Sequence, residues 1–470
     1  MGFAFSAGDF NVDAIWQIGR KARPPIRSSL EDGTMDYMAN RPMGSLGRDQ
    51  IRKMDILVAE PEKLLMAKII FVNRFFYPDQ SATSQILTDV AFSLARDFHE
   101  VHVISSRNLI AGPDDHLHRS EMTRNVAIHR VGPMARQSPG LITRLLNFLS
   151  FYWWAAFQLR KHATDNCIVV VKTDPPLLSV WAWWLLRNRR VRVVNWLQDV
   201  YPEVAIRLVR GRIGHVLMRL RDRSLRHAAA NVVLGSRMAD YLASRNVLRS
   251  SMRVIPNWVD DEVIRPVEPD ANLLRREWGL ADKFVIGYSG NLGRVHEFDT
   301  VLAAAERFKG RRDLRFLFIG GGFQYARLKQ ELRRRGLEGL ALFMPYQNQS
   351  ELAHSLSVPD AHWLSLRPEF EGLIVPSKFY GIAAAGRATL SIADADGEIA
   401  RLVARYKCGA VVKPGDADGL ADLLESMISN RALSAEWGRN GRAMIEMHFS
   451  RKLAIDKWRD LIASLDPEFP

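Results

Sequence analysis

Short apolar runs separated by helical stretches constrain the fold of this chain more than any other feature of its sequence. In the first half, the spacing of Ile86, Val90 and Leu94 predicts an amphipathic helix over 83–98. Strands that alternate with helices are typical of a parallel sheet covered by helices on both faces. The apolar runs that predict strands lie at 69–72, 101–104, 126–131, 168–171, 191–194 and 231–234.

The same pattern restarts after Pro256-Asn257-Trp258, with strands expected at 284–288, 315–319 and 388–393. We therefore expect an α/β fold of two Rossmann-like, doubly wound domains that face a cleft. Ligands of such sheets bind beyond the carboxyl ends of the strands. The expected segments are an extension at 1–65, a first Rossmann-like domain at 66–262, a second at 263–448, and a helix at 449–470 that crosses back to the first domain.

The extension and the composition narrow the class of protein. Turn formers interrupt residues 1–65, so we expect this extension to be mostly disordered; alternatively, translation starts at Met66, directly before the first strand. The net charge of +13 favours an anionic partner, which could be a bilayer surface, nucleic acid or a phosphorylated substrate. Cys167 and Cys408 are too far apart in sequence to suggest a disulfide framework or a zinc motif.

The segment 367–387 carries the densest set of candidate binding groups. A helix is predicted to start near Pro376, and the N–H groups at such a start can hold an anion without a metal. Lys378 could neutralise a departing diphosphate, and the glutamates before it could accept hydrogen bonds from sugar hydroxyls. An ordinary loop-to-helix junction is the alternative. The candidates in this segment are Glu369, Glu371, Gly372, Pro376, Ser377 and Lys378, of which Glu371 and Lys378 are predicted to be catalytic.

Two glycine loops in the second half add to this candidate donor site. Glycine lets backbone N–H groups approach a phosphate, and an arginine beside it can supply the counter-charge. The first loop offers Gly290, Asn291, Gly293 and Arg294, and the second offers Gly321. Tyr346 could stack on a base or serve only in packing. Asp394 and Asp396 have the spacing of a metal-binding pair, but such pairs are common by chance, and we expect neither a metal nor another cofactor.

Two loops of the first half are candidates for the acceptor side. Asp199 follows a strand and could take the acceptor's proton or stabilise positive charge on the sugar; capping the next helix is the alternative. Gln198 beside it is a candidate acceptor contact. In the other loop, Asp79 and Ser81 could contact the acceptor, although Ser81 could also be a helix cap.

An aromatic, basic surface is predicted in the first domain. Residues 141–159 are apolar but interrupted by polar side chains, which favours a helix lying on a membrane over one that spans it. Residues 202–227 add seven arginines against two acids. We expect contact with an anionic membrane surface rather than nucleic acid, because the aromatic residues lie in apolar blocks and not among the arginines. A solvated basic face is the alternative.

Taken together, these motifs resemble the family 4 glycosyltransferases of the GT-B architecture. Within that family, the chain is similar to the branch of bacterial surface polysaccharide synthesis, such as the fucosyl- and fucosaminyltransferases of colanic acid and O-antigen synthesis. The motifs that carry the resemblance are 76–78 (FYP), 196–203 (WLQDVYPE), 254–260 (VIPNWVD), 288–293 (YSGNLG) and 375–380 (VPSKFY).

The resemblance implies a retaining, metal-independent transfer of sugar from a nucleotide-diphosphate sugar to a polyprenyl-diphosphate-linked saccharide. It also implies a cytoplasmic protein, peripheral on the inner face of the cytoplasmic membrane. The chain departs from the family pattern where a second glutamate is usual, because Ser377 or Gly381 stands there. Asn291 replaces the usual arginine, and Gln198 lies near the position of a usual histidine. A nucleotide-sugar epimerase and a non-catalytic polysaccharide-assembly protein remain alternatives.

Overall fold

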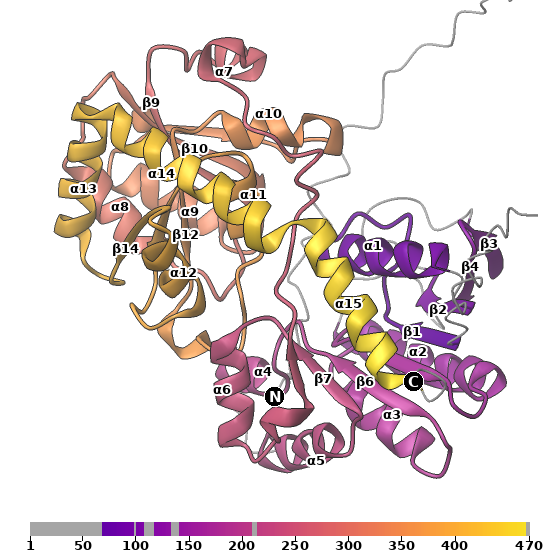
Figure 1. Cartoon of the computed structure of the whole chain (residues 1–470). Helices are drawn as coiled ribbons and strands as arrows, with labels where there is room; N and C mark the ends of the chain where they lie inside the picture. The colour runs from indigo at the N-terminus through magenta and orange to yellow at the C-terminus, as the bar shows by residue number, and fades with distance from the viewer. Residues whose placement is uncertain (1–67, 98–99, 108–116, 133–140, 209–213, 467–470) are drawn as a thin grey trace, which may run out of the picture. The chain divides into compact units, whose positions relative to one another are not determined.

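The computed structural model describes residues 68–97, 100–107, 117–132, 141–208 and 214–466. The predicted extension at 1–65 lies outside these residues. The described residues form the expected two α/β domains, each built on its own sheet (Figure 1). The central strands are short and apolar, and most of their side chains are buried on both faces because helices cover both sides, whereas β3, β8, β11 and β14 are more exposed.

The first sheet has eight described strands in the order β3-β4-β2-β1-β5-β6-β7-β8. All pairs are parallel except the antiparallel pair of β3 and β4. The sequence pattern did not predict β3. Arg124 and Asn125 join these two strands with φ of 48° and 63°, the backbone of a tight hairpin turn. The strands are β1 Lys68–Val72, β2 Glu100–Ser106, β3 Ser120–Thr123, β4 Val126–Val131, β5 Ile168–Val171, β6 Arg192–Trp196, β7 Ala230–Val233 and β8 Met252–Val254.

Helices cover the two faces of the first sheet. Alternate residues of β1 point to opposite sides: Phe71 packs in a cluster with α1 and α15, and Ile70 packs in a cluster with α2 and α3. The helices are α1 Ala82–Arg96, α2 Leu141–His162, α3 Leu178–Leu186, α4 Glu203–Leu208, α5 Gly214–Arg226, α6 Ser236–Ser244 and, from the end of the chain, α15 Arg451–Leu465.

The second sheet has six described strands, all parallel, in the order β11-β10-β9-β12-β13-β14. The strands are β9 Phe284–Asn291, β10 Leu314–Gly321, β11 Ala341–Met344, β12 Ala361–Ser365, β13 Ala388–Ile392 and β14 Gly409–Val412. The helices are α7 Leu273–Glu277, α8 Asp299–Glu306, α9 Tyr325–Arg334, α10 Leu352–Ser357, α11 Lys378–Ala384, α12 Glu398–Tyr406, α13 Ala417–Ser429 and α14 Arg431–Met444.

The two halves of the chain share contacts at several points. The backbone of Asp199 forms an antiparallel bridge with that of Ile374, and Val200 N–H donates to the carbonyl of Leu373. One hydrophobic cluster contains residues of α6 as well as residues of α11 and α12. As the sequence predicted, the last helix returns to the first half, where α15 runs beside α1 (Figure 1).

Candidate functional site

The strand order creates one switch point in each sheet. The chain leaves β1 towards β2 on one side and later adds β5 on the other, and it leaves β9 towards β10 before adding β12. Loops at such switch points diverge and leave room for a ligand beyond the carboxyl ends of the strands. The predicted glycine loop begins inside β9, whose last residues are Gly290 and Asn291, and the segment 367–378 follows β12. The strand order therefore brings together two segments that the sequence had only suggested separately.

Lys378 is the centre of the second switch point. Its Nζ donates to Tyr288 Oη at 2.9 Å and to the carbonyl of Asn291 at 2.8 Å, and lies 3.1 Å from His296 Nε2. Burial lowers the pKa of Lys378 to about 7. The ammonium therefore loses its proton readily unless an anion is placed beside it.

The hydrogen bonds of His296 determine that Lys378 donates to it. Its Nδ1 lies 2.5 Å from the carbonyl of Ser365, an arrangement in which Nδ1–H donates and Nε2 can accept from Lys378. Burial, and next the charge of Lys378, lower the pKa of His296 to about 3, so the ring is neutral. A neutral acceptor holds Lys378 in place without cancelling its charge.

The glycine loop is held closely against these groups. Gly290 has φ of 113°, and a Cβ there would lie 2.8 Å from Cε of Lys378. The side chain of Gln324 donates to the carbonyls of Gly293 and His296, both at 2.7 Å. Gln324, in the loop after the neighbouring strand, therefore stabilises this loop, and glycine at 290 leaves room for the side chain of Lys378.

The other donor-side candidates are distributed around this centre. The guanidinium of Arg294 lies over the ring of Phe323, with Cζ 3.9 Å from the ring centroid. The ring of the half-exposed Tyr346 would be 3.3 Å from a Cβ at Gly321. In this structure, Tyr346 therefore covers the backbone of Gly321.

The two predicted glutamates have different surroundings. Glu369 forms an ion pair with Arg367, and both side chains are partly exposed. Glu371 accepts the backbone N–H of Glu398 at the start of α12, and burial raises its pKa to about 7. A Cβ at Gly397 would lie 2.4 Å from Oε1 of Glu371, so this carboxyl group fits closely against the α12 loop.

The remaining residues of this segment are backbone features. Gly372 has φ of 74°, which glycine adopts without strain, and Ser377 precedes α11 without a side-chain capping bond. Pro376 is buried just before it. The expected helix start is therefore present, and Lys378 is its first residue.

Charged side chains lie at the first switch point, in the loops that follow β1, β5 and β6. Arg74 Nε lies 3.3 Å from Asp174 Oδ1, and Lys172 Nζ donates to the carbonyl of Thr83 at 2.9 Å. Burial lowers the pKa of Lys172 to about 7 and raises that of Asp174. Burial, and next the charge of Asp174, raise the pKa of Asp199 to about 6.

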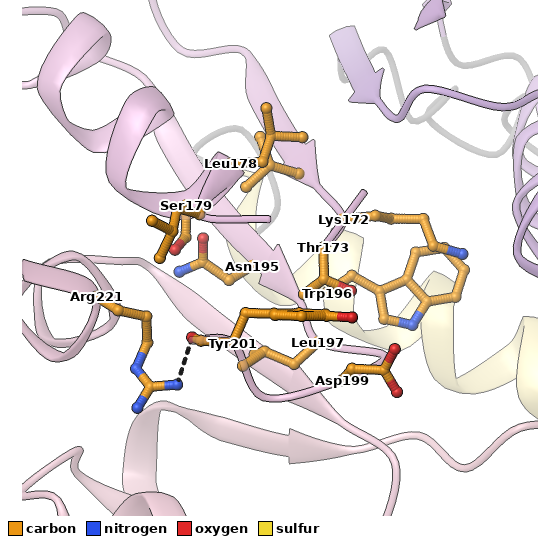
Figure 2. Close-up of a pocket in the computed structure, with 12 residues that line it drawn as sticks. Lys172, Thr173, Leu178, Ser179, Asn195, Trp196, Leu197, Asp199, Tyr201 and Arg221 are labelled. Carbon is orange, nitrogen blue, oxygen red and sulfur yellow. Dashed lines mark hydrogen bonds between the residues drawn. The ribbon is translucent and has the colours of Figure 1, made fainter. Parts of the chain in front are cut away.

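A pocket opens beside Asp199 in the first domain (Figure 2). Lys172 is at one end of it, with its Nζ 4.0 Å from the ring centroid of Trp196, and Arg221 donates to the carbonyl of Tyr201 at the other end. A carboxylate and an amine at one pocket can hold and deprotonate a hydroxyl-bearing molecule. The lining residues include Val171, Lys172, Thr173, Leu178, Ser179, Asn195, Trp196, Asp199 and Arg221.

The predicted acceptor contacts lie in loops that follow β1 and β6. Asp79 is buried and its Oδ1 accepts the N–H of Ser81, which precedes α1. Within the described part of the chain, Ser81 Oγ and Gln198 Nε2 are buried and have no hydrogen-bond partner. Buried polar atoms usually have partners, so these two are suited to a polar ligand.

Several residues of these sites were not predicted. Lys172 and Asp174 lie just after the predicted strand 168–171. Tyr288 lies inside a predicted strand, and His296 lies six residues beyond the glycine at 290. The position of Lys172 and Asp174 after a strand was a signal that could have identified them. Tyr288 and His296 carry no such signal, and only the folded loop brings them to the site.

Asp394 and Asp396 form a turn before α12. Asp394 Oδ1 accepts the N–H of Asp396, whose carboxylate pairs with Arg237 at 3.1 Å and with Arg401. These contacts give both carboxylates a structural role at the junction with α6.

The predicted interfacial helix is α2, and its outer face is apolar. None of the described helices combines the length and the hydropathy needed to cross a bilayer. One expectation for the basic surface is wrong: Arg221 is buried, because it pairs with Glu203 and Asp222 inside the domain. The exposed apolar side chains of α2 are Leu145, Leu146, Leu149, Trp153, Trp154 and Phe157.

Family models match both halves of the chain. Residues 82–258 match the glycosyl transferase 4-like domain, and residues 270–444 match the glycosyl transferases group 1 domain. Together these matches cover the second sheet and all of the first except β1, and they include the loops that follow β5, β6, β9 and β12.

Three relatives illustrate the similarity. A protein of Escherichia coli named as a colanic acid biosynthesis glycosyl transferase, WcaI, is 27% identical over 75% of this chain and 90% of its own. A protein of Pseudomonas aeruginosa named as glycosyltransferase WbjE is 25% identical over 85% of this chain and 98% of its own. The solved structure of HepE from Anabaena in complex with UDP superposes with a TM-score of 0.66 at 15% identity, covering 84% of this chain and 100% of that one.

Proposed function

Because the chain is a glycosyltransferase, with a glycosyl transferase 4-like domain followed by a group 1 domain, we propose that it builds a bacterial surface polysaccharide. It takes a sugar from a nucleotide-diphosphate sugar and transfers it, with retention and without a metal, to a lipid-linked saccharide. The names of the relatives support this: one refers to colanic acid, and HepE has been solved with UDP and with UDP-glucose. Because both family models describe glycosyl transferases, they argue against the alternative of a nucleotide-sugar epimerase.

The observation that carries the proposal is the position of Lys378. It lies at the second switch point, and its neighbours there are the neutral His296, a hydroxyl and a carbonyl. The negative charge of a departing diphosphate favours the ammonium form of Lys378, which burial alone disfavours. A fixed cation of this kind stabilises developing charge in the transition state, the role that a metal ion plays in other transferases.

On the acceptor side, Asp199 takes the proton of the attacking hydroxyl. Its pKa of about 6, raised by burial and by Asp174, leaves it mostly ionised at neutral pH while it stays basic enough to accept a proton. Ser81 and Gln198 supply the buried polar atoms that bind the acceptor.

The outer face of α2 binds the membrane that carries the lipid-linked acceptor. Its six exposed apolar side chains lie within 145–157, and the exposed Arg160 and Lys161 follow them at the end of the helix. Arg189, from the turn after α3, donates to the carbonyls of Arg160 and Ala163 and so adds its basic side chain at the same end of α2. An apolar face with a basic edge suits an anionic bilayer surface, and the protein acts on the cytoplasmic face.

A thermal-shift screen with EDTA present tests the donor assignment. We expect one nucleotide-diphosphate sugar among the UDP-, GDP- and dTDP-linked series to raise the melting temperature, because a ligand that binds only the native state stabilises it. Lys378→Ala should lower turnover about 100-fold or more, whereas Lys452→Ala, at an exposed residue of α15, should leave it unchanged.

Two results would overturn this proposal. One is full turnover of Lys378→Ala, and the other is wild-type activity that EDTA abolishes and manganese restores. The anomeric configuration of the product, measured by proton NMR, tests retention separately.

A further inference from the structure

Three histidines from separate elements meet beside the first sheet. His102 lies on β2, His129 lies on β4 and His162 is the last residue of α2. One ring nitrogen from each lies within 4.8 Å of the other two. His102 Nδ1 and His129 Nε2 are 2.9 Å apart, and the rings of His129 and His162 face each other with centroids 4.1 Å apart. Packing alone seldom gathers three ionisable rings in this way.

A carboxylate orients the first of these rings. Glu100 Oε1 lies 2.7 Å from His102 Nε2 and 2.9 Å from Lys68 Nζ. Burial tends to raise the pKa of Glu100, but its hydrogen bonds with His102 and Lys68 lower it, so it is ionised. A carboxylate that accepts from one imidazole nitrogen directs the other nitrogen towards a metal, as in carboxylate–histidine–zinc triads.

The other two rings are suited to act as neutral ligands. Burial, followed by the neighbouring His162 and His102, lowers the pKa of His129 to about 4, and burial also lowers that of His162. Among the described residues, Nε2 of His162 is buried without a hydrogen-bond partner. A neutral imidazole is the form that binds metals, and an unpartnered buried nitrogen is stabilised by such a bond.

We propose that His102, His129 and His162 bind one divalent transition-metal ion, with Zn²⁺ as the best fit. Zn–N bonds of about 2.0–2.1 Å place tetrahedral nitrogen ligands roughly 3.3 Å apart. The 2.9 Å contact therefore has to widen by a few tenths of an ångström, and the ring of His162 has to turn away from its stacked position. The first movement separates two side chains of neighbouring strands, and the second is a rotation of the His162 side chain at the end of α2.

The metal would have a structural role. His162 lies a short turn before β5, at the amino end of that strand, whereas the loops of the proposed reaction follow the carboxyl ends. The ion would join the end of α2 to β2 and β4 and so fix the helix proposed to bind the membrane. This site is separate from the proposed transfer chemistry, which stays metal-independent.

Zinc binding by the full-length chain, without a histidine tag and after chelator treatment, tests the site. We expect titration calorimetry to give one Zn²⁺ per chain and the melting temperature to rise with Zn²⁺. His162→Ala should weaken binding at least about tenfold, and Glu100→Gln about tenfold, as for other carboxylates that orient a metal-bound imidazole. His215→Ala, at an exposed histidine of α5, should bind zinc as the wild type does.

The visible spectrum of the Co²⁺-substituted protein gives a readout that is independent of stability. Bands typical of tetrahedral coordination should appear in the wild type and in His215→Ala but not in His162→Ala. A nucleotide-sugar thermal shift in His162→Ala shows that this variant is folded. Absence of Zn²⁺ uptake by the wild type, or equal uptake by His162→Ala, would refute the site.

Discussion

Burial shifts the pKa values of the two residues proposed to carry the reaction in opposite directions. Desolvation disfavours the charged form, so it raises the pKa of Asp199 to about 6 and lowers that of Lys378 to about 7. The proposed mechanism requires both residues in their charged forms. The pH range in which both are charged is therefore narrow.

The dependence of kcat/KM on pH should consequently be a narrow bell. Activity falls as the pH drops through about 6, because Asp199 gains a proton, and as it rises through about 7, because Lys378 loses one. Initial rates at low donor concentration from pH 5 to 9 measure the profile.

Two substitutions assign the limbs of this profile. Lys378→Arg should remove the alkaline limb, because a guanidinium does not titrate in this range. Asp199→Asn should lower kcat about 100-fold or more and remove the acid limb from the residual activity. A variant that keeps the limb assigned to its residue would contradict that residue's role.

At the scale of elements, the local sequence predicted most of the described strands and a few of the helices, but not their surroundings. The apolar composition of 141–159, interrupted by polar side chains, correctly indicated a helix with an apolar face, since that signal lies within the segment. The arginines of α5 also looked like one basic face, yet Arg221 is buried because Glu203 and Asp222 meet it. Which side of a helix meets the sheet depends on residues distant in sequence.

The outer face of α2 should bind anionic vesicles. The double variant Leu149→Ser/Trp153→Ser should weaken binding about tenfold or more, because inserting each apolar side chain contributes roughly 1.5–3 kcal/mol. Its stability should change little, since both side chains are exposed. Sedimentation with vesicles containing phosphatidylglycerol measures the effect.

A matched control is Met447→Ser, which removes another exposed apolar side chain from the second half of the chain. We expect this variant to sediment as the wild type does. Equal loss in both variants, or no binding by the wild type, would contradict a membrane role for α2.

At the scale of the whole molecule, the last helix completes the core of the first domain. Trp458 of α15 is fully buried. The centroid of its ring lies 4.4 Å from the ring centroid of Trp196 and 6.5 Å from that of Phe71. The first domain therefore depends on the end of the chain for its stability.

Trp458→Ala should lower the free energy of unfolding by about 3–5 kcal/mol, because it leaves a large cavity between α15 and the first sheet. Urea denaturation followed by circular dichroism measures the change. Trp153→Ala, at an exposed tryptophan, should change stability by less than about 0.5 kcal/mol. A Trp458→Ala variant as stable as Trp153→Ala would show that α15 is dispensable for the core.

The sequence by itself determined the alternation of strands and helices, the two-domain fold and the glycosyltransferase class, because periodicity and short motifs are properties of neighbouring residues. It also identified Asp199, Glu371 and Lys378 as candidates. Only the tertiary structure decided their surroundings: which strands adjoin at each switch point, that Lys378 lies against His296, and that Glu371 fits against α12. These contacts, like the three-histidine cluster, join segments distant in sequence, so no local pattern contains them.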